Sequence, residues 1–440
     1  MTKPAFMLSA LGVSLTLAMS AGASSAPAPE RSLPRIGVRS GTPYAEFYNV
    51  ATGARFSPGG FNYTILDRVA NRKTFPYRPT YAHVTFDSGF YDPASIDAVL
   101  ASMHDHGFNV IRVILDSGDA VHQDRGQYGI AGPFESLGLY KPFVDNLVDF
   151  LRRARRHAMY VIVALHAYPE NRGFRTMVQS GTLPHVTGTN QYYFSPGGIR
   201  AKTAYVTDLV RDVASVDGGS LLTTVLAWEV QVEIFVSDIW EPFSLHSGTV
   251  VTADGRSYDM SDAASRQACM DANLVNWATA VSAAIRAQDP HALVTAGSAT
   301  YDAVHKPGGP NGLIGTPGSD PRYPPRLLAF ARSRALSFID VHAYPRNYSG
   351  YTLEHDLDSN EFGSWDRRAM PVLIGEFGAN QRQFPTVESA IAAIRRQQQE
   401  ALRLGIAGTV YWTWNTLPDR DKWWSAVEDD GAVLKALLRP

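Results

Sequence analysis

Residues 370–378 read Met370-Pro371-Val372-Leu373-Ile374-Gly375-Glu376-Phe377-Gly378, and the fold is best worked out from this stretch. Its apolar part, Val372 to Ile374, is too short for a helix and is bounded by proline and glycine. This pattern indicates a buried parallel strand. Glu376 follows at the carboxyl end of that strand, where parallel sheets carry their chemistry. Glu376 is therefore either a nucleophile or base, or a structural carboxylate paired with an arginine.

Composition and charge exclude several classes of protein. The chain has 440 residues, 45% of them hydrophobic, and a formal net charge of −2. This length is enough for one large core or two ordinary ones. No long run of Lys and Arg occurs, so nucleic acid is not an expected partner. Cys269 is the single cysteine, which rules out an internal disulfide framework.

The first residues predict export. Lys3 precedes a largely apolar run from Ala5 to Met19, and Ala21-Gly22-Ala23 fits a small-residue cleavage site. We interpret residues 1–23 as a signal peptide, 24–34 as a flexible leader and 35–440 as one catalytic domain. No later run is long and apolar enough for a membrane span. The mature protein is expected in the periplasm or the medium, and its oligomeric state is left open.

Helix and strand patterns alternate along the rest of the chain. A hairpin signal at residues 46–57 and a short strand at 59–63 come first. Expected helices then cover residues 92–107, 141–157, 199–216, 263–287, 326–334, 387–404 and 431–438. Expected strands cover residues 109–115, 160–166, 224–229, 293–296, 338–342, 372–374 and 408–412. This alternation predicts an α/β fold of the (β/α)8 TIM barrel type. A doubly wound open sheet is the alternative, but no glycine fingerprint follows the first strand.

Polar and aromatic residues follow the predicted strands. They are Arg112, His166, Glu233, His342, Tyr344, Glu376, Trp412 and Trp414. A barrel brings all strand ends around one mouth, so we expect a polar pit with aromatic walls. Each residue alone also has a structural explanation, as an ion-pair partner, a hydrogen-bonded histidine or a packed tryptophan. Burying all of them without function would be costly unless they paired among themselves.

Two carboxylates stand out within this set. Residues 228–233 alternate in period 2, which predicts Glu229, Gln231 and Glu233 on one face with Glu233 nearest the mouth. Glu233 and Glu376, from strands four and seven, can then face each other. Two carboxylates about 5 Å apart are what retaining glycoside hydrolysis requires. No Gly-x-Ser-x-Gly elbow, phosphate-binding loop or His-Glu-x-x-His signature occurs, and neither a metal nor a cofactor is expected.

These motifs resemble the clan A glycoside hydrolases, most closely glycoside hydrolase family 5, which contains cellulases and mannanases. The resemblance covers residues 56–414. It implies Glu376 as nucleophile and Glu233 as acid/base, with a sugar site formed by Arg112, His166, His342, Tyr344 and Trp412. It implies a carbohydrate substrate cleaved at a β-glycosidic bond by double displacement. A transglycosylase and a catalytically silent carbohydrate-binding barrel are the alternatives on the same fold.

One position departs from the family pattern. The family normally has an asparagine before the acid/base Glu, where its amide contacts the sugar 2-hydroxyl and the nucleophile, whereas this chain has Val232. A valine can do neither, so we expect a substrate other than a simple β-glucan.

Two long connections, 167–198 and 234–262, are expected on the face of the barrel that carries the active site. They carry aromatic residues able to stack on sugar rings: Tyr168, Tyr192, Tyr193, Phe194, Trp240 and Phe243.

Overall fold

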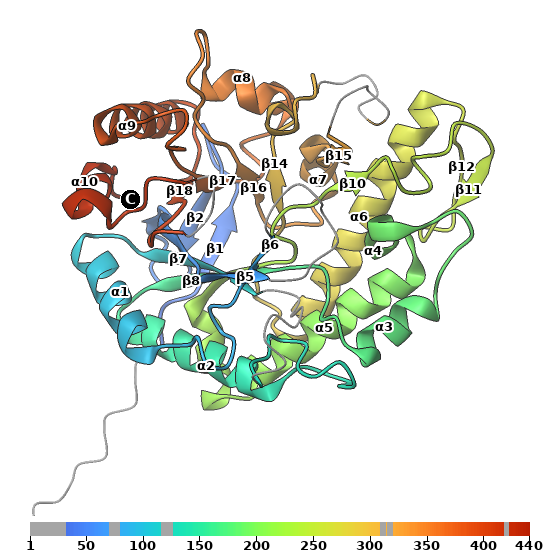
Figure 1. The fold of residues 1–440 in the computed structure, drawn as a ribbon. Coiled ribbons are helices and arrows are strands. Elements are labelled where there is room, and N and C mark those ends of the chain that lie inside the picture. Colours follow the sequence, from blue (N-terminus) through green and yellow to red (C-terminus); the bar gives the residue numbers. More distant parts are fainter. Residues whose placement is uncertain (1–31, 70–79, 116–125, 309–313, 315–319, 418–421) are drawn as a thin grey trace, which may run out of the picture. The chain divides into compact units, whose positions relative to one another are not determined.

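Parallel strands form the centre of the fold in the computed structural model, which describes residues 32–69, 80–115, 126–308, 314, 320–417 and 422–440 (Figure 1). Their order in the sheet is β13-β9-β8-β7-β4-β18-β17-β16-β14. The bounds are β4 (Gly59–Tyr63), β7 (Val110–Leu115), β8 (Tyr160–Leu165), β9 (Val225–Glu229), β13 (Val294–Thr295), β14 (Gly297–Ala299), β16 (Ile339–His342), β17 (Val372–Phe377) and β18 (Gly408–Tyr411).

The sheet closes at one short segment of the chain. β13 pairs with β9, whereas β14, which follows after Ala296, pairs with β16 on the other side. The two ends of the strand order therefore meet in residues 294–299, so β13 and β14 together serve as the fifth strand of the ring. This arrangement confirms the predicted (β/α)8 barrel.

Helices surround the strands, as Figure 1 shows. The main ones are α1 (Pro93–Asp105), α2 (Lys141–Arg156), α5 (Pro196–Ala214), α6 (Ala263–Gln288), α7 (Leu327–Ser333), α9 (Val387–Arg403) and α10 (Glu428–Ala436). Their starts follow from local chemistry. Asp92 accepts hydrogen bonds from the N–H groups of Ala94 and Ser95 at the start of α1, and Thr386 forms a capping box with Ser389 at the start of α9.

Smaller elements decorate the barrel. The predicted hairpin is present as β2 (Glu46–Asn49) and β3 (Arg55–Phe56), and β1 (Ile36–Arg39) joins it as an unpredicted third strand. Two-stranded ribbons are formed by β5 (Leu66–Val69) with β6 (Thr80–His83), β10 (Val236–Ser237) with β15 (Arg322–Tyr323), and β11 (Thr249–Val251) with β12 (Ser257–Asp259). Short helices are α3 (Arg172–Gln179), α4 (Gln191–Phe194), α8 (Leu353–Asp358), η2 (Gly188–Asn190), η3 (Asp217–Thr224), η4 (Asp302–Val304) and η5 (Phe362–Ser364).

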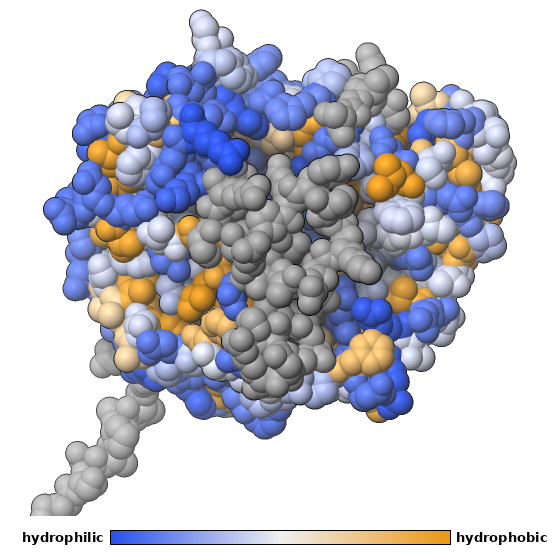
Figure 2. Space-filling model, in the orientation of Figure 1, coloured by the Kyte–Doolittle hydropathy of each residue, from blue (hydrophilic) through white to orange (hydrophobic). Residues whose placement is uncertain are grey.

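Two regions of the sequence prediction remain predictions. The expected signal peptide at 1–23, and the part of the leader up to residue 31, lie outside the described residues. From Ser32 to Pro440 the chain forms one compact unit. Across its described residues, no helix has both the length and the apolar character needed to cross a membrane. On the face in Figure 2, hydrophobic residues are interspersed among hydrophilic ones.

The barrel strands are apolar and buried, with a few polar exceptions. Every residue of β7 and β8 is buried. Such strands normally read as continuous hydrophobic runs because both faces are covered. Three ionisable side chains nevertheless lie fully buried within strands: Arg112 on β7, Glu229 on β9 and Asp340 on β16. Buried charges require partners, so these residues mark the interior that needs a chemical explanation.

Candidate active site

Arg112 is the centre of a buried charge cluster inside the barrel. Its Nε and Nη2 donate to the two carboxylate oxygens of Glu229 at 2.6 and 2.7 Å. Its Nη1 donates at 2.6 Å both to Glu376 Oε1 and to Asn62 Oδ1. Burial acts to lower the pKa of Arg112, but the charges of Glu229 and Glu376 outweigh it and raise that pKa well above its usual range. Arg112 therefore stays cationic and fixes one oxygen of Glu376.

Glu376 has both of its oxygens engaged. Besides the bond from Arg112 to Oε1, Oε2 accepts a hydrogen bond of 2.6 Å from the hydroxyl of Tyr344. Burial acts to raise the pKa of Glu376, but His342 and Arg112, with the Tyr344 hydrogen bond, lower it below its usual value. Burial and Glu376 itself raise the pKa of Tyr344 well above its usual range, so the phenol stays a donor. Glu376 is thus an oriented, ionised carboxylate.

His342 links Glu376 to the second carboxylate, Glu233. Its Nδ1 lies 3.0 Å from Glu233 Oε1 and 3.5 Å from Glu376 Oε2. One oxygen of each carboxylate and one ring nitrogen of His342 all lie within 4.8 Å of one another. Burial acts to lower the pKa of His342, but the charge of Glu376 and the hydrogen bond to Glu233 raise it to about 9. Glu233 is the more accessible carboxylate, with 30% of its side chain exposed.

An irregularity in strand pairing brings these groups together. The parallel register of β16 and β17 shifts between Val341 and His342, so that Val341 pairs with Ile374 but His342 pairs with Glu376. The shift skips Gly375, where an added Cβ atom would lie only 2.2 Å from Asp340 Oδ1. Bulges of this kind re-aim side chains next to functional sites.

The prediction for residues 228–233 was partly wrong. β9 ends at Glu229, and residues 230–235 are irregular, so the period-2 alternation does not continue to Glu233. Glu229 points into the barrel onto Arg112, while Glu233 reaches His342 from the segment beyond the strand. Val232 lies half-buried beside Glu233. Its side chain has no hydrogen-bonding group to offer a ligand.

Aromatic and imidazole rings flank this network. Trp423 packs on Tyr344 with the ring centroids 4.5 Å apart. His83 lies between two predicted site residues, with centroid distances of 5.8 Å to His166 and 6.5 Å to Trp412. The side-chain nitrogen of Lys202 donates a hydrogen bond to the carbonyl oxygen of His166. His166 and the half-buried Trp412 directly follow β8 and β18, and their role as walls of a sugar site stays a prediction.

Most of the other aromatic residues predicted to contact the sugar pack against other parts of the protein. Trp414 is buried and packs against Phe61, so it supports the barrel from within. Tyr168 is buried against Tyr192. Trp240, 42% exposed, lies over Gly188, whose missing side chain leaves room for the indole ring. The remaining loop aromatics predicted to stack on sugars are buried in the core and present no face to a ligand: Tyr193, Phe194 and Phe243.

Sequence reasoning missed several members of the network. Asn62 was not singled out, although its side chain joins Arg112 to the carbonyl oxygen of Gly375 at 3.0 Å. Glu229 was predicted to share a face with Glu233 but was given no role in the site. His83 and Trp423 were not among the predicted site residues. Asp340 was also missed. Its signal was a single carboxylate inside an apolar strand, two residues before His342, where alternation places both side chains on the same face.

Comparison with known proteins supports the fold. No family model matches the chain, and no curated protein sequence matches it. The endo-β-1,4-mannanase of Thermotoga petrophila superposes with a TM-score of 0.56 at 18% identity, covering 87% of this chain and 76% of that one. The β-1,4-D-mannanase of Cryptopygus antarcticus gives 0.52 at 17% identity, covering 92% and 94%.

A third structure differs in length. The exo-β-1,4-mannosidase of Opitutaceae bacterium strain TAV5 gives a TM-score of 0.50 at 15% identity, covering 90% of this chain. The match spans 57% of the mannosidase. At identities this low the similarity is one of fold, and function must be argued from the site itself. The chain therefore shares the barrel fold of these mannan-cleaving enzymes.

Proposed function

We propose that this protein is a retaining glycoside hydrolase in which Glu376 is the nucleophile and Glu233 the acid/base. The observation that carries the proposal is the carboxylate pair itself, with one oxygen of each residue within 4.8 Å of the other. Retaining glycosidases hold their two carboxyl groups about 5–5.5 Å apart, whereas inverting ones keep about 6.5–9.5 Å between them for a water molecule. Closest oxygens within 4.8 Å are compatible with the retaining spacing, and this supports double displacement.

In the first step, an oxygen of Glu376 forms a bond to the anomeric carbon as the glycosidic bond breaks. Arg112 and Tyr344 each hold one oxygen of Glu376, so the attacking carboxylate is oriented before the substrate arrives. The ionised state of Glu376 follows from its lowered pKa. Glu233 gives its proton to the leaving oxygen, and the bond electrons move onto that oxygen.

In the second step, water releases the sugar. The Glu233 carboxylate takes a proton from a water molecule, the water oxygen bonds to the anomeric carbon, and the ester bond to Glu376 breaks. His342 remains within hydrogen-bonding distance of Glu233 and close to Glu376. Its positive charge can therefore offset negative charge on either carboxylate as that charge passes from Glu376 to Glu233 in the first step and back in the second.

Val232 supports a particular substrate class. A sugar hydroxyl directed at this side chain would lose water without gaining a partner, at about 1–3 kcal/mol. Sugars that direct no equatorial 2-hydroxyl there avoid this penalty, which includes manno-configured, furanose and 2-substituted units. Because solved structures with this fold include β-mannanases, β-mannan is the first polymer to test. The predicted signal peptide supports an activity outside the cytoplasm.

A catalytically silent sugar-binding barrel is the second candidate function, and Val232 is the observation that favours it. The proposed nucleophile nevertheless keeps Arg112 and Tyr344, which each hold one of its oxygens. Calorimetric sugar binding without turnover on any substrate would support the silent barrel.

The test is a screen of purified protein against polysaccharides based on mannose, galactose, glucose and furanose units. For any substrate that is cleaved, proton NMR follows the anomeric configuration of the first product. Retention of configuration is the expected result. Inversion would contradict the double displacement, and hydrolysis of none of the polymers would contradict the hydrolase assignment.

A further inference from the structure

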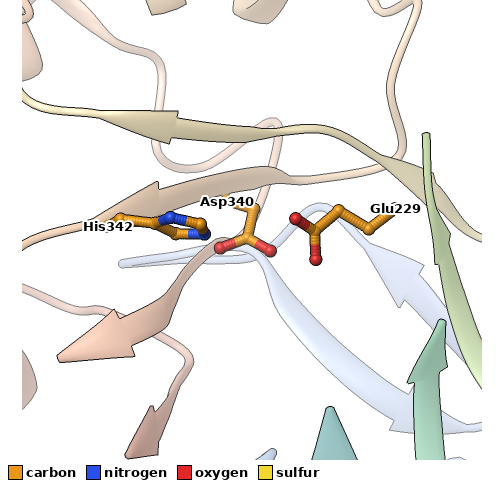
Figure 3. A group of neighbouring side chains, drawn as sticks. All are labelled: Glu229, Asp340 and His342. Atoms are coloured by element: carbon orange, nitrogen blue, oxygen red, sulfur yellow. The ribbon is translucent and has the colours of Figure 1, made fainter. Parts of the chain in front are cut away.

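Asp340 is a fully buried carboxyl in the barrel interior that the mechanism above does not use. It lies on β16, two residues before His342. Among the described residues, neither of its oxygens has a hydrogen-bond partner, and the same is true of His342 Nε2. Figure 3 shows the carboxyl of Asp340 between the ring of His342 and the carboxyl of Glu229. One atom from each of the three lies within 4.8 Å of the others.

The backbone makes room for this contact at two glycines. An added Cβ atom at Gly375 would lie 2.2 Å from Asp340 Oδ1. At Gly297 it would lie 2.7 Å from Glu229 Oε1 and 2.9 Å from His342 Nε2. Any side chain at either position would push these polar groups apart. Glycine is suited to such close approaches because it has no Cβ.

The charges that face Asp340 determine its own state. Two are cations, Arg112 on β7 and His342 on β16, and two are anions, Glu229 on β9 and Glu376 on β17. The two positive and two negative charges cancel. An ionised Asp340 would therefore add an uncompensated negative charge in the barrel interior. Burial first, and then the charge of Glu229, raise the pKa of Asp340 to about 7 against the opposing effect of His342. A carboxylic acid kept neutral in this way can donate a hydrogen bond.

We propose that Asp340 is a positioning residue that carries a proton, donates its O–H to Glu229 and accepts the Nε2–H of His342. This assignment pairs the acid with the two groups on either side of it, Glu229 and His342. It requires them to close from within 4.8 Å to hydrogen-bonding distance. It also holds the imidazole ring so that Nδ1 faces Glu233 and Glu376. The consequence for catalysis rests on the proposed function, whereas the protonation of Asp340 does not.

A bound cation is the competing explanation for three converging ligand groups. Arg112 already donates to both oxygens of Glu229, so a metal ion there would lie next to a buried guanidinium. Like charges held together in a low-dielectric interior repel strongly. A proton satisfies the same atoms without adding a second cation beside Arg112, and this favours the neutral acid.

The first experiment compares isosteric and truncating substitutions. Asp340→Asn keeps one acceptor for His342 Nε2–H and one donor for Glu229, whereas Asp340→Ala removes both. On the substrate identified by the polysaccharide screen, Asp340→Asn should keep kcat/KM within about threefold of wild type near pH 6, and Asp340→Ala should lose roughly 30-fold or more. Equal damage by the two substitutions, or failure of Asp340→Asn to fold, would overturn the neutral bridge.

The pH profile of kcat/KM gives a second readout. In wild type, ionisation of Asp340 brings a negative charge beside the network as pH rises through about 7, so activity should fall there. Asp340→Asn cannot ionise, and its alkaline limb should move upward by about one unit or more, towards the pKa of about 9 of His342. Asp271→Asn is the matched control, since burial raises the pKa of Asp271 to about 6 at a place outside this network. In Asp271→Asn the alkaline limb of the kcat/KM profile should stay where it is in wild type. If the alkaline limb of Asp340→Asn also stays there, the proposal is contradicted.

A third measurement needs no substrate. A carboxyl whose pKa is raised by folding favours the folded state at low pH and loses that contribution as pH rises through its folded value. The stability of Asp340→Asn relative to wild type should therefore increase from about pH 5 to about pH 8 in urea unfolding. A pH-independent difference would overturn the proposal even if the enzyme is active. Stabilisation of wild type by added Zn²⁺ or Ca²⁺, lost in Asp340→Asn, would also overturn it and assign a cation instead.

Discussion

Arg112 and Arg326 each bind two carboxylates, and their surroundings differ. Arg112 inside the barrel binds Glu229 and Glu376, with no exposed surface on its side chain. Arg326, next to α7, donates to both oxygens of Glu361 at 2.8 and 3.0 Å and to Asp271 at 3.2 Å. Seen as ion pairs alone, the two clusters are equivalent.

The difference lies in what remains unpaired. In the Arg326 cluster, Asp271 has its second oxygen bound by Gln267, and no atom of Asp271, Arg326 or Glu361 is buried without a partner. In the Arg112 cluster, a histidine joins two carboxylates and leaves one nitrogen facing an unpaired acid. Buried ion pairs are therefore weak evidence for function. A histidine shared between acids, together with unpaired polar atoms, is the stronger sign.

Removing one carboxylate from each cluster should give the largest contrast. Glu376→Ala should lower kcat by at least about 10³-fold without unfolding the barrel, because a covalent nucleophile is lost. Glu361→Ala removes an equally arginine-bound carboxylate and should change stability while leaving kcat within about threefold. Steady-state kinetics with circular dichroism at matched concentration makes the comparison. A folded Glu376→Ala protein that keeps more than about a tenth of the activity would contradict the assigned nucleophile.

Removing each arginine should separate the clusters by stability. Arg112→Met leaves Glu229 and Glu376 buried without their cation and should destabilise the protein by about 3–5 kcal/mol. Arg326→Met should cost about 1–3 kcal/mol, since Arg326 and Asp271 keep 18% and 21% of their side-chain surface exposed. Urea unfolding measures both free energies. Equal losses would show that full burial of the Arg112 cluster has no energetic consequence.

A smaller effect is expected from removing one tyrosine hydroxyl near each cluster. Tyr344→Phe removes the hydroxyl that donates to Glu376, and should lower kcat by roughly 10- to 100-fold. That hydrogen bond helps to lower the pKa of Glu376, so its loss raises this pKa and moves the acid limb of kcat/KM to higher pH. Tyr301→Phe, near the Arg326 cluster, removes a hydroxyl bound to the carbonyl of Pro324 and should leave the limb in place. An unmoved acid limb in Tyr344→Phe would count against this role.

Substitution of Val232 should change kcat/KM the least, and the direction of the change should depend on the substrate. Val232→Asn introduces a donor and an acceptor beside Glu233, worth about 1–3 kcal/mol to a sugar that directs a hydroxyl there. We expect kcat/KM on β-glucosides to rise relative to that on the native substrate. Parallel assays of wild type and variant on both substrates give the ratio. If wild type already prefers simple β-glucosides, the selectivity argument is wrong.

The barrel was readable from the sequence because its strands are short apolar runs separated by amphipathic helices. The parts that were not readable depend on pairing between distant segments. β1 joins the predicted hairpin through backbone hydrogen bonds to β2, and the fifth strand divides at Ala296 to close the ring. Neither feature has a distinctive local pattern, because strand pairing is decided by tertiary context.

The site was readable to the extent that it lies at strand ends. Arg112, His342, Tyr344 and Glu376 lie around one centre in the structure, although Arg112 lies in the middle of β7 and not at its end as expected. The partnership of Asp340 with Glu229 was not readable. It depends on a one-residue register shift between β16 and β17, and on two glycines that remove side chains from the space. Register shifts of this kind are set by packing across the sheet.

Covalent trapping tests the central claim most directly. A 2-deoxy-2-fluoro glycoside with a good leaving group, in the configuration that the polysaccharide screen identifies, should form the glycosyl-enzyme faster than water releases it. Mass spectrometry of the intact and digested protein should show one added sugar, carried by the peptide that contains Glu376 and absent in Glu376→Ala. An adduct on another residue, or inversion of configuration without any adduct, would contradict the account.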